Sequence, residues 1–185
     1  MRERLRPALS AQALAQMYAV PHDHRRWSDH EIRVDATVAL GRRAAWSGVS
    51  SAADLSCGNG SILAAIPAGT HYYGDLAPGY DITGSIEQTI EQIPMVDLFV
   101  CCETIEHLDD PDTVLKAIRA KTSLLLLSTP VDAWRDTNIE HYWAWSRDDV
   151  EQMLAAAGFA VRLYACLDLT PAAPDSYCFG IWICR

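Results

Sequence analysis

The sequence predicts an α/β protein: an open, mostly parallel sheet of seven strands, with helices on both faces and a terminal antiparallel strand pair. Three observations favour this fold class. Short, continuously apolar runs alternate with helical patterns, which is typical of strands buried on both faces of a parallel sheet. Glycine and proline residues separate these runs. The last two apolar runs follow each other without a helix between them, as in an antiparallel pair.

Residues 1–45 are predicted to form helices that cover the sheet, and residues 46–185 the sheet itself, within one compact domain. A chain of 185 residues is long enough to bury a core of this kind. Apolar residues at helical spacing mark a first helix, through Leu9, Ala13, Leu14 and Met17, and a second, through Ile32, Ala36, Val38, Ala39 and Leu40.

Five apolar runs then predict five strands, at residues 52–56, 72–76, 81–86, 96–102 and 124–128. A helix begins at Ser61 and is stopped by Pro67. Asp110 and Pro111 predict the start of another helix, because aspartate is a favoured N-cap and proline is tolerated at the first helical position. Pro130 is expected to end the fifth strand, because proline cannot donate to a sheet ladder.

The spacing of Ser146 and Asp149 resembles a capping box, with aspartate in place of glutamate, and Gly158 is expected to close that helix. The terminal strand pair is expected at residues 159–167 and 177–184. Ligands of open parallel sheets bind beyond the carboxyl ends of the strands. One rim of the sheet is therefore expected to gather residues 56–60, Asp75, Ser85, residues 101–107 and residues 128–130.

The charge distribution favours a cationic ligand at this rim. The net charge is −9, and residues 44–115 contain acidic residues but no lysine or arginine. Nucleic-acid binding needs a basic patch. Only the N-terminal arm is rich in arginine, and it also carries acidic residues, so nucleic acid is not an expected partner.

Membrane association is not expected either, because no apolar run approaches the roughly 20 residues of a membrane span. The basic start of the chain has an apolar part broken by Gln12 and Gln16, unlike a signal peptide. The six cysteines form no CxxC pair, which indicates reduced thiols in a cytoplasmic protein.

A glycine loop, Asp54-Leu-Ser-Cys-Gly-Asn-Gly60, follows the first predicted strand. Such a turn holds either a dinucleotide or an adenosyl cofactor, or is purely structural. Its glycine order is not the GxGxxG of dinucleotide-binding loops, which argues against a nicotinamide dehydrogenase. Asp54 stands where a carboxylate can orient the loop amides or accept from a cationic amine. About 20 residues later, Asp75 can accept both hydroxyls of a ribose or can simply form a turn.

From about residue 52 to residue 159 the sequence resembles the class I S-adenosylmethionine-dependent methyltransferases. Within that family it is most similar to the small-molecule branch that contains the ubiquinone and menaquinone biosynthesis enzymes. Four stretches carry the resemblance: the glycine loop; Tyr73-Gly-Asp75; the segment 96–111 with Glu103-Thr-Ile-Glu106-His107; and the ordered set of residues 124–131, 141–146 and 157–159.

The resemblance implies S-adenosylmethionine as the cofactor and S-adenosylhomocysteine as the product. It assigns cofactor binding to Asp54, Ser56, Gly58, Asn59, Gly60, Asp75, Leu76, Ser85, Ile86 and Cys102. Two of these positions depart from the family, since Ser56 replaces a usual glycine and Ser85 a usual acid. Only the six residues Leu76 to Asp81, which include the end of the second strand and the start of the third, stand where the family has a full helix. The sheet is thus expected to be slightly trimmed, with its bare face covered by the N-terminal helices or by a second subunit of a homodimer.

His107 is the candidate catalytic residue, since an imidazole can take the proton of a hydroxyl or amine acceptor. The alternative is that its ring only caps local structure. Of the two glutamates near it, Glu103 and Glu106, one is expected to orient the ring. His141, Tyr142 and Trp143 are candidate acceptor-binding residues, with core packing as the alternative for the tryptophan.

No metal ion is expected. The histidines His22, His24 and His30 have no fourth ligand at metal spacing. Their loop is instead expected to fold over the cofactor, with Arg25, Arg26 or Arg33 close to the cofactor carboxylate.

The sequence thus indicates a methyltransferase that acts on an oxygen, nitrogen or carbon of a small molecule. Two alternatives remain open. One is a partner protein that binds the cofactor without catalysis, suggested by the missing helix and by Ser85. The other is a nucleic-acid or protein methyltransferase, against which Cys101-Cys-Glu-Thr104 stands where amino-methylating enzymes carry an Asn-Pro-Pro-Tyr-like motif.

Overall fold

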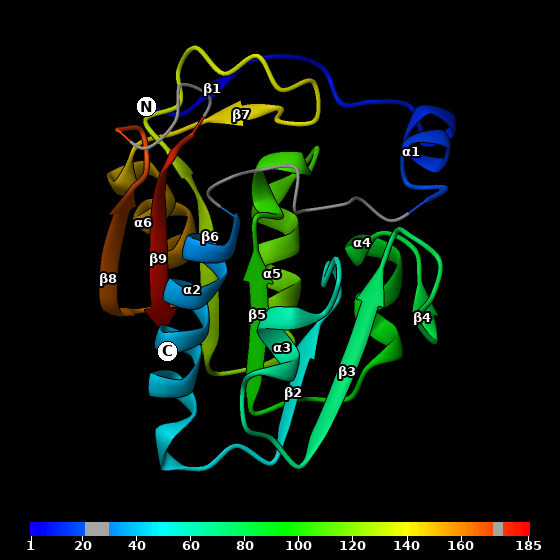
Figure 1. The fold of residues 1–185 in the computed structure, drawn as a ribbon, viewed down its shortest axis with the longest axis vertical. Coiled ribbons are helices and arrows are strands. Elements are labelled where there is room, and N and C mark those ends of the chain that lie inside the picture. Colours follow the sequence, from blue (N-terminus) through cyan, green and yellow to red (C-terminus); the bar gives the residue numbers. More distant parts are fainter. Residues whose placement is uncertain (21–29, 172–175) are drawn as a thin grey trace.

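The main sheet contains seven strands in the order β4-β3-β2-β5-β6-β9-β8 (Figure 1). The computed structural model describes residues 1–20, 30–171 and 176–185. The first five strands in this order run parallel, and β9 runs antiparallel to both β6 and β8. The strands are β2 (Ser51–Asp54), β3 (Thr70–Asp75), β4 (Ile82–Thr83), β5 (Leu98–Cys102), β6 (Leu125–Val131), β8 (Val161–Asp168) and β9 (Cys178–Cys184). The predicted fold class is confirmed.

Helices cover both faces of the sheet (Figure 1). One face is covered by α2 (His30–Ala44), the 3₁₀ helix η2 (Ala45–Ser47) and α3 (Ser61–Ala64). The other is covered by α4 (Ile86–Thr89), the 3₁₀ helix η3 (Ile90–Gln92), α5 (Pro111–Lys121) and α6 (Arg147–Ala156). Consecutive strand residues alternate between the two faces: Leu98 packs on the first and Phe99 on the second. The apolar runs recognised in the sequence are therefore buried on both sides.

The apolar stripe predicted for helix α2 is confirmed in part: Ala36 and Leu40 pack against the core, whereas Ile32 is half exposed. The most deeply buried positions of the helix are Thr37, Gly41 and Ala44. A β-carbon on Gly41 would lie only 2.6 Å from the Ile66 side chain, so the helix approaches its neighbours closely along this stripe. The prediction for Ile32 was wrong because this residue, nine positions from Gly41, lies on the opposite side of the helix.

Two predicted strand boundaries were also wrong. The third strand is only the two residues of β4, because Ser85 forms a capping box with Gln88 and starts α4 at Ile86. Strand β6 continues through Pro130 to Val131, where it still pairs with β9. The carbonyl of Pro130 accepts a hydrogen bond of 2.9 Å from Nε1 of Trp145, so a side chain supports the backbone there.

The trimmed connection between the second and third sheet strands is confirmed. Only residues 76–81 join β3 to β4, and they contain no helix. At the opposite edge of the sheet, the register of β8 against β9 shifts between Val161 and Leu163. No helix among the described residues is long and apolar enough to cross a membrane.

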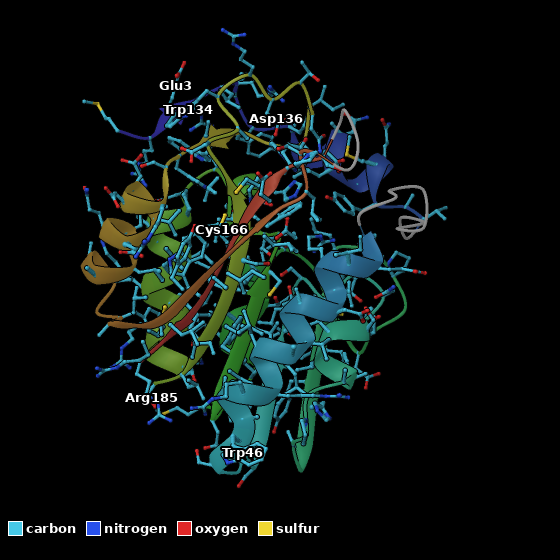
Figure 2. The ribbon with its side chains drawn as sticks, turned by 60° about the vertical axis from the view of Figure 1, so that its left-hand side comes forward. Glu3, Trp46, Trp134, Asp136, Cys166 and Arg185 are labelled. Carbon is cyan, nitrogen blue, oxygen red and sulfur yellow. The ribbon has the colours of Figure 1, made fainter. Side chains whose placement is uncertain are left out.

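The N-terminal segment forms a second, two-stranded sheet that the sequence did not predict. Strand β1 (Glu3–Arg4) pairs antiparallel with β7 (Trp143–Ala144), and the Arg4 guanidinium lies over the Trp143 ring. Helix α1 (Ala11–Met17) then extends over the region of α4 (Figure 1). Figure 2 shows Glu3, Trp134 and Asp136 at the same end of the molecule, away from Trp46. The first residues thus lie at the carboxyl end of the parallel strands.

The predicted start of α5 is confirmed and leads to a stability prediction. The Asp110 carboxylate accepts hydrogen bonds from the backbone N–H of Thr113, at 3.0 Å, and from its hydroxyl, at 2.7 Å. We expect Asp110→Ala to lower the free energy of unfolding by about 1 kcal/mol, the usual loss for an N-cap. Urea unfolding measures this, with Asp148→Ala as the control, because Asp148 is an exposed acid in the first turn of α6 and is not its N-cap. Equal losses in the two variants would contradict the capping role.

Candidate active site

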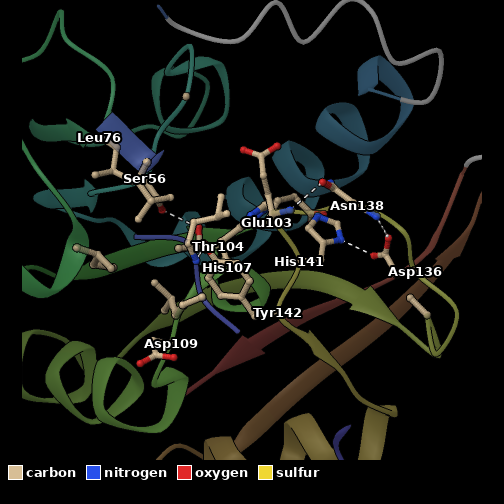
Figure 3. Close-up of a pocket in the computed structure, with 18 of the residues that line it drawn as sticks. Ser56, Leu76, Glu103, Thr104, His107, Asp109, Asp136, Asn138, His141 and Tyr142 are labelled. Carbon is tan, nitrogen blue, oxygen red and sulfur yellow. Dashed lines mark hydrogen bonds and ion pairs between the residues drawn. The ribbon is translucent and has the colours of Figure 1, made fainter. Parts of the chain in front are cut away.

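A cleft of about 1640 Å³ opens at the carboxyl end of the parallel strands, where the sequence placed the rim. Its walls come from the loops after β2, β3, β5 and β6, from the start of α4, and from α1. Figure 3 shows Ser56 and Leu76 towards one end of this cleft, and His141 and Asp136 towards the other. Two chemically different ends therefore share one cavity.

The glycine loop forms part of the first end. Gly58 and Gly60 have φ angles of 56° and 74°, which side chains rarely adopt. The N–H of Gly58 donates to Oδ2 of Asp75 at 2.7 Å, and the hydroxyl of Tyr80 donates to the carbonyl of Gly58 at 3.0 Å. Ser56 does not have a positive φ, so serine fits there without backbone strain. The loop is held to the neighbouring strand end by its own hydrogen bonds.

Asp75 ends β3 and lies on the cleft wall. Besides Gly58, its carboxylate accepts the N–H of Ala77 at 2.8 Å through Oδ1. A carboxylate has about four acceptor positions, so it can still accept from hydroxyl groups of a ligand. Asp75 therefore shapes the loop and offers acceptors to the cleft at the same time.

Asp54 lies beneath the loop, only 3 % exposed and off the cleft wall. Its Oδ1 accepts the N–H of Ser56 at 3.0 Å. Burial raises the pKa of Asp54 to about 7, and the nearby charge of Asp75 adds to the rise. A positive charge arriving in the cleft would favour the ionised form of this carboxyl.

Six of the ten cofactor-binding candidates lie on the cleft wall. Those on the wall are Ser56, Gly58, Asp75, Leu76, Ser85 and Ile86. Four others are not on it: Asp54, Asn59, Gly60 and Cys102. The side chain of Asn59 accepts the N–H of Ser61, at the start of α3, and the thiol of Cys102 is buried 4.0 Å from the carbonyl of Leu126.

The 3₁₀ helix η4 (Ile105–His107) carries Glu106 and His107; Glu106 is not on the cleft wall, and Figure 3 shows His107 beside Thr104. Glu106 is 1 % exposed; its Oε2 accepts the hydroxyl of Thr129 at 2.9 Å, and its Oε1 has no hydrogen-bond partner among the described residues. Burial and the charge of Glu103 raise the pKa of Glu106 to about 8. His107 lines the cleft, and its Nε2 lies 4.0 Å from Oε1 of Glu106.

His141 stands edge-on to His107, with ring centroids 4.7 Å apart. Its Nδ1 lies 2.5 Å from Oδ2 of Asp136, whose other oxygen accepts the hydroxyl of Tyr177 at 3.0 Å (Figure 3). Burial alone would lower the pKa of His141, but the hydrogen bond to Asp136 and the charge of Glu106 raise it overall. The structure thus brings together residues that are more than 30 positions apart in the sequence.

The three acceptor-binding candidates are not equally placed. His141 and Tyr142 line the cleft, and the Tyr142 hydroxyl accepts the N–H of Leu9 at 3.1 Å. Trp143 is not on the cleft wall: its Nε1 donates to the carbonyl of Leu108, and the Arg4 guanidinium covers its ring. Its place corresponds to the packing alternative.

The predictions for the histidine-rich loop are only partly open to inspection. His22, His24, Arg25 and Arg26 lie outside the described residues. His30 begins α2, and Arg33 lies on the cleft wall with its Nη1 4.0 Å from Oε1 of Glu103. One of the three arginines considered for the cofactor carboxylate is therefore in the cleft.

The structure adds contacts and residues that the sequence did not indicate. Glu103, expected from the sequence only as a possible partner of the His107 ring, follows β5 with a strained φ of 53°, and its carboxylate accepts the hydroxyl of Ser128 at 2.7 Å. The hydroxyl of Thr104 lies 2.6 Å from that of Ser56, which joins the two ends of the cleft. Asp136 could have been suspected as an acid five residues before a histidine, whereas the α1 residues, among them Leu14 and Tyr18, carried no signal.

Neither a protein-family model nor a curated protein sequence matches this chain. Solved structures do. The N-methyltransferase NodS from Bradyrhizobium japonicum, in complex with S-adenosylhomocysteine, has a TM-score of 0.71 at 17% identity, covering 94% of this chain and 96% of that one. The 1,6-didemethyltoxoflavin-N1-methyltransferase from Burkholderia thailandensis has a TM-score of 0.70 at 16% identity, covering 100% and 94%. The [4+2]-cyclase SpnF has a TM-score of 0.70 at 13% identity, covering 97% of both chains.

These similarities define the class of fold. The chain has the Rossmann-like fold of class I S-adenosylmethionine-dependent methyltransferases, with its mostly parallel seven-stranded sheet. Because a cyclase is among the similar structures, the fold by itself does not establish methyl transfer.

Proposed function

We propose that this protein is an S-adenosylmethionine-dependent methyltransferase that acts on an oxygen, nitrogen or carbon of a small molecule. One observation carries the proposal. The same cleft has a glycine loop tied to a strand-end aspartate at one end, and His107 and His141 on its wall further along, with the carboxylate of Glu106 buried behind them. The first end suits an adenosyl cofactor, and the second suits the deprotonation of an acceptor.

The residues at the first end fit the cofactor. The left-handed glycines let a ligand approach the loop backbone, and Asp75 has acceptor capacity left for a ribose. The buried Asp54 favours a ligand that carries positive charge. Ser56, Gly58, Asp75 and Leu76 would hold the methionine part and ribose, with Ser85 and Ile86 beside the adenine. When bound, the cofactor supplies a methyl group on a positively charged sulfur.

The protein's own contribution is positioning and proton transfer. An in-line displacement requires that the acceptor atom be held in line with the methyl group. The Thr104–Ser56 contact, at 2.6 Å, keeps the segment that carries His107 at a constant distance from the glycine loop. His107, on the cleft wall, would take the proton of a hydroxyl or amine acceptor.

Charge favours a small acceptor over a nucleic acid. The rim carries no lysine or arginine between residues 44 and 115, and among the described residues the lysine and arginine side chains on the cleft wall are Arg33 and Arg135. Binding of a polyanion requires several such cations along one surface. The similarity to the 1,6-didemethyltoxoflavin-N1-methyltransferase, solved with 1,6-didemethyltoxoflavin bound, also supports a small acceptor.

Calorimetric titration with S-adenosylmethionine and S-adenosylhomocysteine tests the proposal at its first step. We expect one molecule of either ligand to bind per chain. No heat of binding with both ligands at millimolar concentration would rule the proposal out. Binding without release of S-adenosylhomocysteine in a broad screen of acceptors would instead favour a cofactor-binding partner protein.

A variant at His107 tests the second step. We expect His107→Ala to bind S-adenosylhomocysteine as the wild type does, because His107 belongs to η4 and not to the glycine loop or the end of β3. Its turnover, measured as S-adenosylhomocysteine release with an acceptor from the screen, should fall tenfold or more. His71→Ala, which changes a histidine outside the cleft, is the control. Unchanged turnover in His107→Ala would contradict a catalytic role for this ring.

A further inference from the structure

We propose that Glu106, His107 and His141 form a binding site for a divalent metal ion of the first transition row. One potential ligand atom from each residue lies within 4.8 Å of the other two. Ligand atoms that are about 2.1 Å from a shared ion lie roughly 3 to 4 Å apart. The three groups therefore need to move inward by less than about 1 Å to reach a common ion.

The distances within the cluster fit a shared ion better than direct hydrogen bonds. Nε2 of His107 is 4.0 Å from Oε1 of Glu106, which exceeds hydrogen-bonding distance. Oε1 has no hydrogen-bond partner among the described residues, although Glu106 is 99 % buried. An unpartnered carboxylate oxygen in the protein interior is unfavourable unless an ion or a ligand satisfies it.

The rest of Glu106 is fixed, so that its free oxygen has a defined direction. The hydroxyl of Thr129 donates to Oε2 at 2.9 Å, and the carbonyl of Glu106 accepts the N–H of Tyr142 at 2.8 Å. The second bond also joins η4 to the segment that carries His141. The two halves of the site are thus held together by the backbone next to the ligands.

Asp136 orients His141 as outer carboxylates orient metal-binding histidines. Nδ1 of His141 lies 2.5 Å from Asp136, which leaves Nε2 for the ion. Asp136 is itself held by the hydroxyl of Tyr177 and by the N–H of Asn138, at 3.0 and 2.7 Å. Such a carboxylate–histidine pair is typical of metal sites, where it selects the tautomer and raises the basicity of the ligand.

The donor set indicates the kind of ion. Two imidazole nitrogens and one carboxylate oxygen suit Mn²⁺, Fe²⁺, Co²⁺ or Zn²⁺ better than Ca²⁺ or Mg²⁺, which prefer all-oxygen sites. Three protein ligands leave coordination positions open towards the cleft, onto which His107 and His141 face. A hydroxyl oxygen of the acceptor can occupy one of them and lose its proton more readily there. This role of the ion, unlike the site itself, rests on the proposed function. With the ion bound, His107 would act as its ligand and not as the direct proton acceptor, because a ring nitrogen that binds a metal cannot also take a proton.

Titration of the metal-free protein with MnCl₂ tests the site directly. The resonance signal of free Mn²⁺ disappears when the ion is bound, so electron paramagnetic resonance gives stoichiometry and affinity without any acceptor. We expect one Mn²⁺ per chain. Glu106→Gln and His141→Ala should each weaken binding at least tenfold, and Asp136→Asn should weaken it 10- to 100-fold through the orientation of His141.

His71→Ala is the matched control, because His71 lies on β3 and contacts the carbonyl of Ile66, away from the cluster. Circular dichroism melting verifies that each variant is folded. If a variant of a buried ligand does not fold, His107→Gln replaces it as a test of metal binding, because the His107 side chain is partly exposed. The site is refuted if the wild type shows no saturable binding at millimolar Mn²⁺, or if the ligand variants bind as tightly as His71→Ala.

The failure of one proposal is distinguishable from the failure of the other. Metal binding without binding of S-adenosylhomocysteine would retain the site and reject the methyltransferase. Binding of S-adenosylhomocysteine without metal binding would do the reverse. If the protein binds both the metal ion and S-adenosylhomocysteine, the spectrum of bound Mn²⁺ should change when a hydroxylated acceptor is added. An unchanged spectrum with an acceptor that the enzyme does methylate would reject a contact between the ion and the acceptor.

Discussion

Replacing Asp75 with alanine is expected to weaken the binding of S-adenosylhomocysteine by at least 100-fold, or about 2.7 kcal/mol. The substitution removes the acceptor of the Gly58 N–H and of the Ala77 N–H, so that the bond from the Cys57 N–H to the Gly74 carbonyl remains as a tie of the glycine loop to β3. It also removes the carboxylate that would accept the ribose hydroxyls. Hydrogen bonds to charged groups contribute about 1.5 to 3 kcal/mol each, so a loss of this size is physically reasonable.

Asp35→Ala is the control for this experiment, because Asp35 is an exposed acid on α2 outside the cleft. Isothermal titration calorimetry of both variants, at one pH and one salt concentration, gives the two affinities. If Asp75→Ala binds within threefold of the wild type, then Asp75 does not hold the cofactor. If Asp75→Ala no longer melts cooperatively, the hydrogen bonds of Asp75 are needed for folding. Asp75→Asn, which retains one acceptor oxygen, is then used to measure the effect on cofactor binding in a folded protein.

Asp54→Asn is expected to make the protein more stable above pH 7. The pKa of Asp54 is about 7 in the folded protein and 3.8 in the unfolded chain. Between these values the folded state keeps a proton that the unfolded state has lost, so stability falls as pH rises from about 4 to 7. One pKa unit corresponds to about 1.4 kcal/mol, and the total fall at this residue is about 4 kcal/mol. Asparagine has no such titration and keeps an oxygen that can accept from Ser56.

Urea unfolding of both proteins at several pH values measures this effect. The difference in the free energy of unfolding between Asp54→Asn and the wild type should be largest at pH 8 and smallest near pH 4. A difference that does not change with pH would mean that Asp54 is ionised at its ordinary pKa in the folded protein. We also expect Asp54→Asn to bind S-adenosylmethionine less tightly at pH 8, because a buried negative charge near the cationic ligand is lost.

The sheet was predictable from the sequence because its strands are buried on both faces. Each strand of the core, such as β5, is a short apolar run between polar turns, and such a run is visible without knowledge of its partners. Helix starts at Asp110 and Ser146 were equally visible, because caps depend only on neighbouring residues. The fold class follows from these local signals.

The parts that were missed depend on contacts between distant segments. Strand β1 has two residues and exists only because it pairs with Trp143 and Ala144, about 140 positions away. At Gly41 a side chain would collide with that of Ile66, which is 25 positions away in the sequence. Pro130 remains within β6 because β9 pairs with it and the Trp145 side chain donates a hydrogen bond to its carbonyl. Local propensity contains no information about such partners.

In the candidate site, too, single residues were predictable from the sequence, whereas contacts between distant residues were not. The Glu-x-x-Glu-His segment identified Glu106 and His107 by their spacing, and His141 was chosen from an aromatic cluster. What the sequence did not reveal is that a ring nitrogen of His141 comes close to Glu106, with Asp136 behind it. The expectation that no metal binds was drawn from the histidines at 22, 24 and 30, whereas the metal-compatible cluster combines residues from two distant loops.

The two outer strands of the sheet bear on how the protein avoids aggregation. An exposed strand edge can pair with another molecule through its free N–H and C=O groups. At one edge β4 presents only two residues, as a result of the trimmed connection after β3. At the other edge, a register shift in β8 between Val161 and Leu163 leaves the charged Arg162 outside the ladder with β9. A very short outer strand and a charged bulge are both features that oppose edge-to-edge pairing of sheets between molecules.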